Sequence, residues 1–309
     1  MGQISIDLSG KWISCVTLEN HLNLVQDTTI KDCSDFLITV PNGGNIMVDA
    51  GVRLLSYLNQ LSKLGKKVCL NFEDGEDGAF GYLNRIGFFD HLEDDITTIP
   101  ERPNFSSADI FRGNNSGVLE IIPIDPINLP RDSSLPTTLA NKLLSNIIDE
   151  EIKASFDTPC YTFFAELVEN IYLHSQTKLK GFIAFQVYKK GTSVKVTVSD
   201  SGIGLLTSLR SKIEDHYPQY KDVDDAKLIE LMFSEGLSKD GVDKGCGLKT
   251  CAKHALKFHA TLDVRLPHSR FHLTPLDSRI FGYEAQGSIT KTTLDFDGTH
   301  ITLDISLDK

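Results

Sequence analysis

The chain has 309 residues, of which 40% are hydrophobic and 24% are charged, and its formal net charge at pH 7 is -11. Such a composition is typical of a globular protein, and the length is sufficient for two domains of ordinary size. The acidic balance argues against nucleic acid as the main partner, because a phosphate backbone is bound by clustered Lys and Arg. A single nucleotide is not excluded, since backbone N–H groups and a metal can hold its phosphates.

The sequence also bears on location. It has no apolar run of the roughly 18 residues that a membrane span needs, and residues 1–10 are too polar for a signal peptide. Its six cysteines form no CxxC pair and no zinc-binding spacing, which predicts reduced thiols. We therefore expect a cytoplasmic protein that makes no membrane contact.

The first part of the chain alternates strand-like and helix-like segments. In chain order these are the strand 36–40 (FLITV), the helix 51–65, the strand 67–72 (KVCLNF) and the helix 79–92. This βαβα order predicts an open α/β sheet. Residues 97–138 are rich in Pro, Asn and Ser around one strand-like segment, 118–124. Turn-forming residues at this density mark connections, so we expect domains at 1–130 and 131–309.

The second part mixes helices with strands that alternate in polarity. The expected helices are 139–156, 163–175, 225–233 and 248–259, and the expected strands are 181–191, 192–200, 260–266, 287–296 and 299–307. Segments 181–191 and 192–200 form a predicted hairpin, because apolar residues recur at every second position. This order of elements predicts an α+β sandwich with one layer of helices and one of strands.

The helix predicted at 163–175 (FFAELVENIYLHS) carries polar residues beside its apolar face. At about 100° per residue, Glu166, Asn170 and His174 follow one another at i, i+4 and i+8 and form a strip along the margin of that face. Asn170 offers Mg²⁺ a neutral oxygen ligand. Glu166 can activate a water or hydroxyl that attacks a phosphate. A solvated helix margin would show the same pattern, so both interpretations stay open at this point.

Two glycine-rich motifs follow that helix, VSDSGIG at 198–204 and DKGCGLKT at 243–250. At the end of the first strand, the carboxylate of Asp200 can accept a hydrogen bond from the exocyclic amine of adenine. Gly202 and Gly204 let the backbone pass close to a base or sugar.

In the second motif, Gly245 and Gly247 precede a helix whose first N–H groups can cradle a phosphate. Taken alone, DSGIG is also explained by an ordinary turn and GCG by an ordinary entry into a helix, and these structural interpretations are the more common for such motifs.

In this order the motifs resemble the GHKL ATPase superfamily of gyrase-type topoisomerases, ninety-kilodalton heat-shock chaperones, histidine kinases, mismatch-repair ATPases and anti-sigma serine kinases. The resemblance covers roughly residues 135–309. ELVEN (166–170) resembles the N box, DSGIG (200–204) the first glycine box and GCGL (245–248) the second. The stretch 232–241 (MFSEGLSKDG) is similar to the mobile ATP lid.

The resemblance implies a Bergerat-type two-layer α/β sandwich that binds ATP with Mg²⁺. It assigns Asn170 to the metal and Glu166 to catalysis. It assigns the remaining nucleotide contacts to Asp200 (adenine), Gly202 and Gly204 (base and sugar), Gly245, Gly247 and Leu248 (phosphate loop) and Thr299 (adenine, through its hydroxyl). Lys239, in the lid, either meets the phosphates or is solvated. A contact of His174 with nucleotide or metal is left open.

The resemblance also narrows the activity. Histidine kinases usually carry an amide where this chain has Glu166, whereas hydrolysing members and serine kinases carry a glutamate. We therefore expect an ATPase or a protein serine/threonine kinase that switches an interaction with a partner protein. The alternative is a non-catalytic module whose partner affinity follows ATP occupancy, and a homodimer is possible by resemblance. One departure is Lys249, which replaces a glycine of the second box.

The N-terminal pattern resembles a STAS domain, the fold of anti-sigma-factor antagonists, over roughly residues 30–95. Those antagonists carry a phosphorylatable serine before a small residue and a glycine at a helix start. Here the matching stretch, 48–51, reads VDAG and contains no serine. Asp49 either supplies a fixed negative charge near the helix N-terminus or only caps the helix.

Overall fold

The computed structural model describes residues 2–25, 32–112, 114, 117–147, 149–174, 177–188, 192–241, 248–250, 252–253, 258, 260–275 and 285–306. In these residues helices combine with a four-stranded parallel sheet, a seven-stranded antiparallel sheet and a small two-stranded pair. The fold is therefore a mixture of α and β structure, as the sequence predicted.

The parallel sheet belongs to the first part of the chain and has the strand order β1-β3-β5-β6. Its strands are β1 (Gly2–Asp7), β3 (Cys33–Val40), β5 (Lys67–Phe72) and β6 (Thr97–Ile99), and the small pair is β2 (Trp12–Ile13) with β4 (Asn45–Ile46). The connecting helices are α1 (Cys15–Leu22), α2 (Val48–Lys63), α3 (Ala79–Arg85), the 3-10 turn η2 (Phe89–His91) and α4 (Ser107–Phe111). The predicted βαβα order over 36–92 is confirmed, whereas β1 was not foreseen.

The antiparallel sheet has the order β12-β11-β10-β13-β9-β8-β7. Its strands are β7 (Val118–Ile124), β8 (Gly181–Tyr188), β9 (Ser193–Ser199), β10 (Thr261–Leu266), β11 (Ser269–Pro275), β12 (Ala285–Lys291) and β13 (His300–Ser306). The edge strand β7 pairs with β8 from Val118 opposite Gln186 to Ile124 opposite Gly181. Strand β7 therefore belongs to this sheet, although it lies before the domain boundary that the sequence predicted at residue 130.

Helices of the second part are α5 (Leu135–Leu144), α6 (Glu150–His174), α7 (Leu205–Arg210), α8 (Ile213–His216), the 3-10 turn η4 (Pro218–Tyr220) and α9 (Asp225–Ser234). The predicted helix 139–156 is wrong in its bounds, because the chain breaks after α5 and α6 starts earlier than expected. Asp149 explains the new start, since its Oδ1 accepts from the backbone N–H groups of Glu151 (2.9 Å) and Ile152 (3.0 Å).

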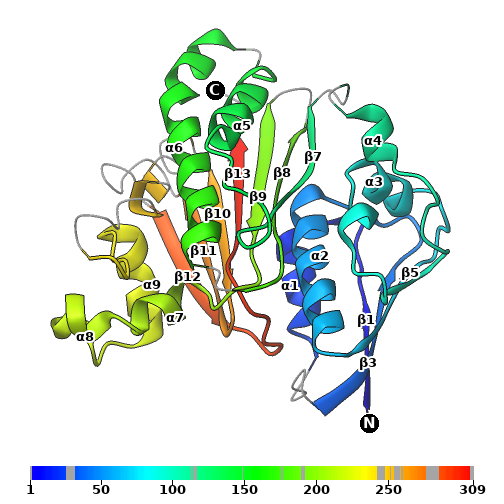
Figure 1. Ribbon diagram of the computed structural model, residues 1–309, viewed down its shortest axis with the longest axis horizontal. Helices are drawn as coiled ribbons and strands as arrows, with labels where there is room; N and C mark the ends of the chain where they lie inside the picture. The colour runs from blue at the N-terminus through cyan, green and yellow to red at the C-terminus, as the bar shows by residue number, and fades with distance from the viewer. Residues whose placement is uncertain are drawn as a thin grey trace.

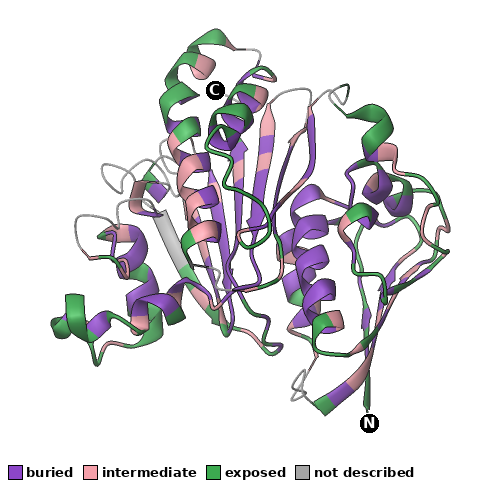
Figure 2. Ribbon diagram, viewed as in Figure 1, coloured by how far each residue is buried: buried purple, intermediate pink, exposed green. Residues whose placement is uncertain are grey.

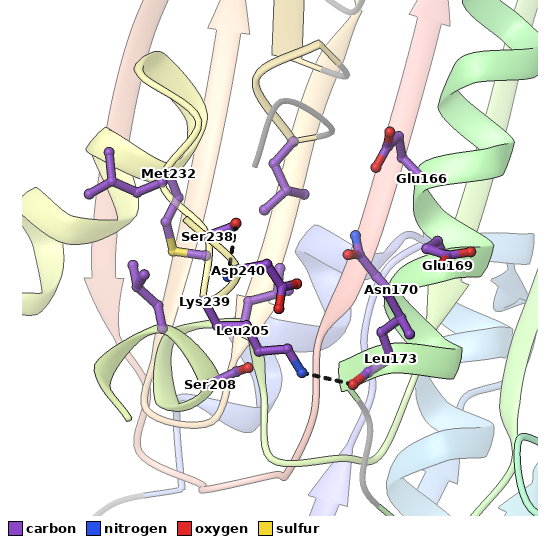
Figure 3. Close-up of a pocket in the computed structure, with 13 residues that line it drawn as sticks. Glu166, Glu169, Asn170, Leu173, Leu205, Ser208, Met232, Ser238, Lys239 and Asp240 are labelled. Atoms are coloured by element: carbon purple, nitrogen blue, oxygen red, sulfur yellow. Dashed lines mark hydrogen bonds between the residues drawn. The ribbon is translucent and has the colours of Figure 1, made fainter. Parts of the chain in front are cut away.

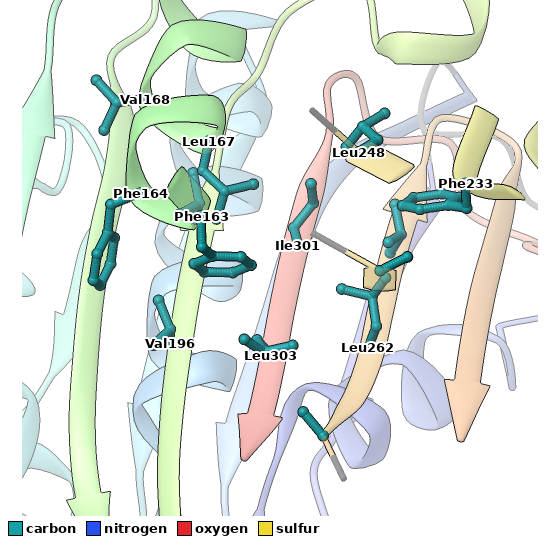
Figure 4. Close-up of a cluster of buried hydrophobic side chains, with 14 of the residues drawn as sticks. Phe163, Phe164, Leu167, Val168, Val196, Phe233, Leu248, Leu262, Ile301 and Leu303 are labelled. Carbon is teal, nitrogen blue, oxygen red and sulfur yellow. The ribbon is translucent and has the colours of Figure 1, made fainter. Parts of the chain in front are cut away.

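Helix α6 packs on one face of the antiparallel sheet (Figure 1, Figure 4). Apolar residues of the helix, among them Phe164 and Leu167, meet every second residue of the strands, such as Val196 and Leu303, in one buried cluster. The approach is close: a Cβ on Gly181 would lie 2.8 Å from Cγ2 of Ile171. This packing fixes the height of the polar helix margin above the sheet.

Helices α1 and α2 cover the opposite face, so α2 lies between the two sheets (Figure 1). Residues 48–61 of α2 are all buried (Figure 2). Phe182 and Ala184 of β8 belong to this second core, while the alternating Ile183 and Phe185 belong to the first. The antiparallel sheet is thus covered by helices on both faces, on one by α6 of the second part and on the other by α1 and α2 of the first part.

Asp49 does not cap α2, whose N-cap position is held by Met47. Its buried carboxylate instead accepts from the backbone N–H of Cys15, at 3.0 Å from Oδ2. None of the described helices combines the length and the apolar character that a membrane crossing requires.

Candidate functional site

A cavity of about 90 Å³ lies between α6, α7, α9 and residues 237–241 (Figure 3). Three segments that the sequence singled out separately meet at its wall. Glu166 and Asn170 come from the ELVEN segment, Leu205 begins the helix after DSGIG, and Leu248 ends the GCGL motif. Lys239 comes from the predicted lid.

The wall formed by α6 presents Glu166 and Asn170, with Glu169 beside them. Glu169 is engaged by Arg131, whose Nη1 donates to its Oε1 at 3.1 Å. Glu166 makes no hydrogen bond or ion pair with another described residue, and partial burial raises the pKa of its carboxyl group. Glu166 is thus the carboxylate on this wall that is available to a ligand.

Two polar atoms at the cavity lack a hydrogen-bond partner among the described residues. They are Nδ2 of Asn170 and Oγ of Ser208, and both are buried. A buried polar atom without a partner costs about 1–3 kcal/mol, so such atoms usually mark the place of a water, an ion or a ligand. Sequence reasoning missed Ser208, although its place one turn into the helix after DSGIG was a usable signal.

Asp200 lies at the end of β9, is 6% exposed and is not among the residues that line the cavity. Its backbone N–H donates to the carbonyl oxygen of Thr299 (3.0 Å), and its Oδ1 accepts from the N–H of Gly202 (2.8 Å). Burial raises the pKa of Asp200 to about 7, against the opposing effect of hydrogen bonds from Gly202 and Thr299. Oγ1 of Thr299 also accepts from the N–H of Leu205 (3.1 Å). The corner around Asp200 therefore connects directly to Leu205, which lines the cavity.

Two glycines are required by close packing in this corner. Gly204 has a φ of +78°, and a Cβ there would lie 2.9 Å from Cδ of Pro267. Gly298 has a φ of +102°, and a Cβ there would lie 1.9 Å from the carbonyl oxygen of Asp200. The loops 200–204 and 297–299 therefore touch, and packing alone accounts for both glycines.

Residues 237–241 form the opposite wall. Nζ of Lys239 donates to the carbonyl oxygen of Leu173, near the end of α6, at 3.0 Å (Figure 3). Leu248 lines the cavity and is 8% exposed. Gly245 and Gly247, together with the side chain of His174, lie outside the described residues.

The oxygen-bearing side chains of Asn170 and Glu166 are suited to a metal ion that binds together with a ligand. No group of three or more His, Cys, Asp or Glu residues that could hold a metal ion occurs in the described part of the chain. Asn170 and Glu166 supply two oxygen donors, and Mg²⁺ is commonly bound by one or two protein oxygens together with phosphates and waters. The residues fit Mg²⁺ carried by a phosphate ligand.

Comparisons with known proteins give no assignment. The chain matches no model of a protein family. A search of curated proteins likewise finds no match.

Proposed function

We propose that this protein is a cytoplasmic, Mg²⁺-dependent ATP-binding protein of the GHKL type that hydrolyses ATP or phosphorylates a partner protein. In this proposal residues 131–309, completed by β7, form a Bergerat-type nucleotide domain, and the preceding residues form a STAS-like regulatory domain. One observation carries it: Glu166 and Asn170 of ELVEN, Leu248 of GCGL and Leu205, the residue directly after DSGIG, line the same cavity.

The Asp200 corner supplies base recognition. A carboxylate at this position accepts from the exocyclic amine of adenine, whereas guanine would present a carbonyl oxygen to the same group and be repelled. Thr299 supports the corner by holding the backbone of Leu205. The proposal therefore predicts a preference for adenine nucleotides.

Asn170 and Glu166 act at the phosphate end. Asn170 provides the protein ligand for Mg²⁺, and the ion supplies neutralisation of the phosphate charge when it is bound. Glu166 accepts the proton of the attacking water or hydroxyl. Its raised pKa suits this role, because a general base acts best when its pKa approaches the working pH.

Nucleotide binding requires the cavity to open. Its volume of about 90 Å³ is below the roughly 300–1,000 Å³ of small-molecule pockets. The segment 237–241 forms the wall that can move, since among the described residues the bond from Lys239 to Leu173 is the one hydrogen bond that ties it to α6. Once released from Leu173, the Lys239 ammonium is free to meet the phosphates.

A second candidate is a binding module whose partner affinity follows ATP occupancy without turnover. The observation that favours it is the isolation of Glu166, which has no orienting partner among the described residues. Catalytic bases are usually held by a second group, and Glu166 would lack one.

Phosphate release from radiolabelled ATP by the purified full chain tests the proposal. We expect Glu166→Gln to abolish release while nucleotide binding is retained, and Asp200→Asn to weaken binding by at least about tenfold. Glu150→Gln, on the exposed first turn of the same helix, is the matched control and should change neither. If the wild type releases no phosphate, the non-catalytic binding module is the function that remains. If Asp200→Asn leaves the nucleotide affinity unaltered, the proposed nucleotide site is wrong.

A further inference from the structure

Helix α2 carries a buried polar stripe that faces the antiparallel sheet. Asp49, Arg53, Tyr57 and Gln60 are spaced so that they share one side of the helix. Arg53 contacts β10 and β13, and Tyr57 stacks on Phe296 with ring centroids 3.9 Å apart. Gln60 is the last member of the stripe and contacts Ser201, the residue after Asp200.

The Gln60 side chain joins the two loops of the Asp200 corner. Its Nε2 donates to Oγ of Ser201 at 2.9 Å and to the carbonyl oxygen of Asp297 at 3.0 Å. Its Oε1 accepts from the backbone N–H of Asp297 at 2.8 Å. Ser201 follows Asp200, and Asp297 precedes Gly298, so one amide connects both loops.

This contact is geometrically demanding. Gln60 is 6% exposed, and three of its four hydrogen-bonding positions are used. A buried amide satisfied in this way fixes the groups it binds, since an alternative placement would leave them without partners. The loops have little freedom to compensate, because Gly298 already touches the backbone of Asp200.

We infer that Gln60 is a positioning residue. Through it the first part of the chain sets the shape of the Asp200 corner and so controls nucleotide affinity. The inference rests on the proposed function and extends it to regulation. A displacement of α2 releases Ser201 and Asp297 and loosens the corner. By thermodynamic linkage, a nucleotide that orders the Asp200 corner also stabilises the contact between α2 and that corner, and by the same free energy.

The neighbouring residue Asn59 provides a matched control. It is also an amide on α2 and is 4% exposed. Its hydrogen bonds, however, go to the carbonyl oxygen of His91 (2.9 Å) and from the N–H of Glu93 (3.0 Å), within the N-terminal half. Gln60→Met and Asn59→Leu therefore each remove a buried amide of α2, but only the first releases the corner.

The test measures adenosine and ATP dissociation constants by calorimetry on the full-length variants, with thermal unfolding recorded in parallel. We expect Gln60→Met to weaken both ligands by about tenfold and Asn59→Leu by less than about threefold, at similar losses of stability. Equal binding by Gln60→Met and wild type overturns the inference. Equal weakening by both variants also overturns it, because the effect would then reflect the stability of α2 alone.

Hydrogen exchange without nucleotide separates this inference from the proposed function. Amides of residues 198–204 and 297–300 should exchange at least about tenfold faster in Gln60→Met than in Asn59→Leu. If the wild type binds no nucleotide, the proposed function fails and the control of affinity fails with it, whatever the exchange rates. If the wild type binds but exchange in the two loops is unchanged in Gln60→Met, the proposed function stands and the inference fails.

Discussion

Arg53 and Asp263, 210 residues apart in the sequence, form an ion pair of 2.9 Å in which both side chains are buried. Nη1 of Arg53 also donates to Oε1 of Glu19 at 3.1 Å. Asp263 is further bound by Arg270, and Glu19 by Arg265 at 3.0 Å. These residues link α1 and α2 to β10 and β11, so the two parts of the chain are joined by charges that water does not reach.

The first prediction concerns Arg53→Met. The substitution leaves Glu19 and Asp263 buried with less opposite charge, and breaking one side of a buried ion pair costs about 3–5 kcal/mol. We expect the free energy of unfolding, measured with urea, to fall by that amount. Arg112→Ala is the control, because the pair Arg112–Asp109 is more than half exposed and such pairs contribute about 0–1 kcal/mol. A loss in Arg53→Met no greater than in the control would contradict the role of the network.

The ion pairs of this network could not be predicted from the sequence. In β10, Leu262 and Val264 alternate with Asp263 and Arg265, a pattern typical of a strand with one solvated face. The structure buries that polar face under α1 and α2. The alternation within β10 predicts that one face of the strand is polar. It cannot predict that this face is buried, because the charge that pairs with Asp263 is on Arg53, in another element of the chain.

The candidate site was more predictable because its signals are local. ELVEN and GCGL each contribute residues to the cavity, and Leu205, which also lines it, directly follows DSGIG. Thr299 lies against Asp200. Gln60 was missed, since it is an ordinary polar residue within a helix and its importance comes from contacts with loops of another layer, which neither hydrophobic period nor composition encodes. Ser208 was missed although its place one turn after DSGIG was a signal in the sequence.

The second prediction is a pH dependence that originates at Asp200. Burial raises the pKa of this residue to about 7, so the folded protein retains a proton that the unfolded chain releases. The associated stability is present below about pH 4 and is lost as the pH rises to about 7, in total roughly 4 kcal/mol. Asp200→Asn removes this dependence, so we expect its unfolding free energy to match the wild type near pH 4 and to exceed it near pH 8.

Ligand binding should show the opposite trend with pH. The adenine amine needs the ionised carboxylate of Asp200, so adenosine affinity should fall as the pH drops below about 7, by up to about tenfold per unit. Adenosine is the suitable probe because it carries no phosphate that titrates. Calorimetric titrations from pH 5.5 to 8.5 would measure the effect, and an affinity that is flat over this range rules out base recognition by Asp200.

The third prediction uses Lys239→Met to test the phosphate contact. Removing the ammonium should lower ATP affinity relative to adenosine affinity by about tenfold, because the charge acts only on phosphates, whereas loss of the bond to Leu173 affects both ligands alike. Lys227→Met in α9 removes the same charge from an exposed pair with Glu230 and serves as control. Equal effects of Lys239→Met on adenosine and ATP would show that the residue acts on the closure of the cavity and not on the phosphates.

The fourth prediction concerns Ser208, whose buried hydroxyl has no partner among the described residues. In the ligand-free protein, Ser208→Ala removes an unsatisfied polar atom, so we expect the unfolding free energy to stay constant or to rise by up to about 1 kcal/mol. In the complex the same substitution removes a hydrogen bond to the ligand, and ATP affinity should fall by about threefold to tenfold.

The opposite signs of these two effects make the substitution informative. A serine that only fills space would show no change in affinity, and one bonded within the protein would show a loss of stability. Ser211→Ala is the control, because its hydroxyl lies one turn further along and donates to the carbonyl oxygen of Ser208 at 2.8 Å, away from the cavity lining. Denaturant unfolding and calorimetry on the same preparations give both values. A stable Ser208→Ala variant with unchanged ATP affinity would mean that the cavity at α7 does not receive the nucleotide.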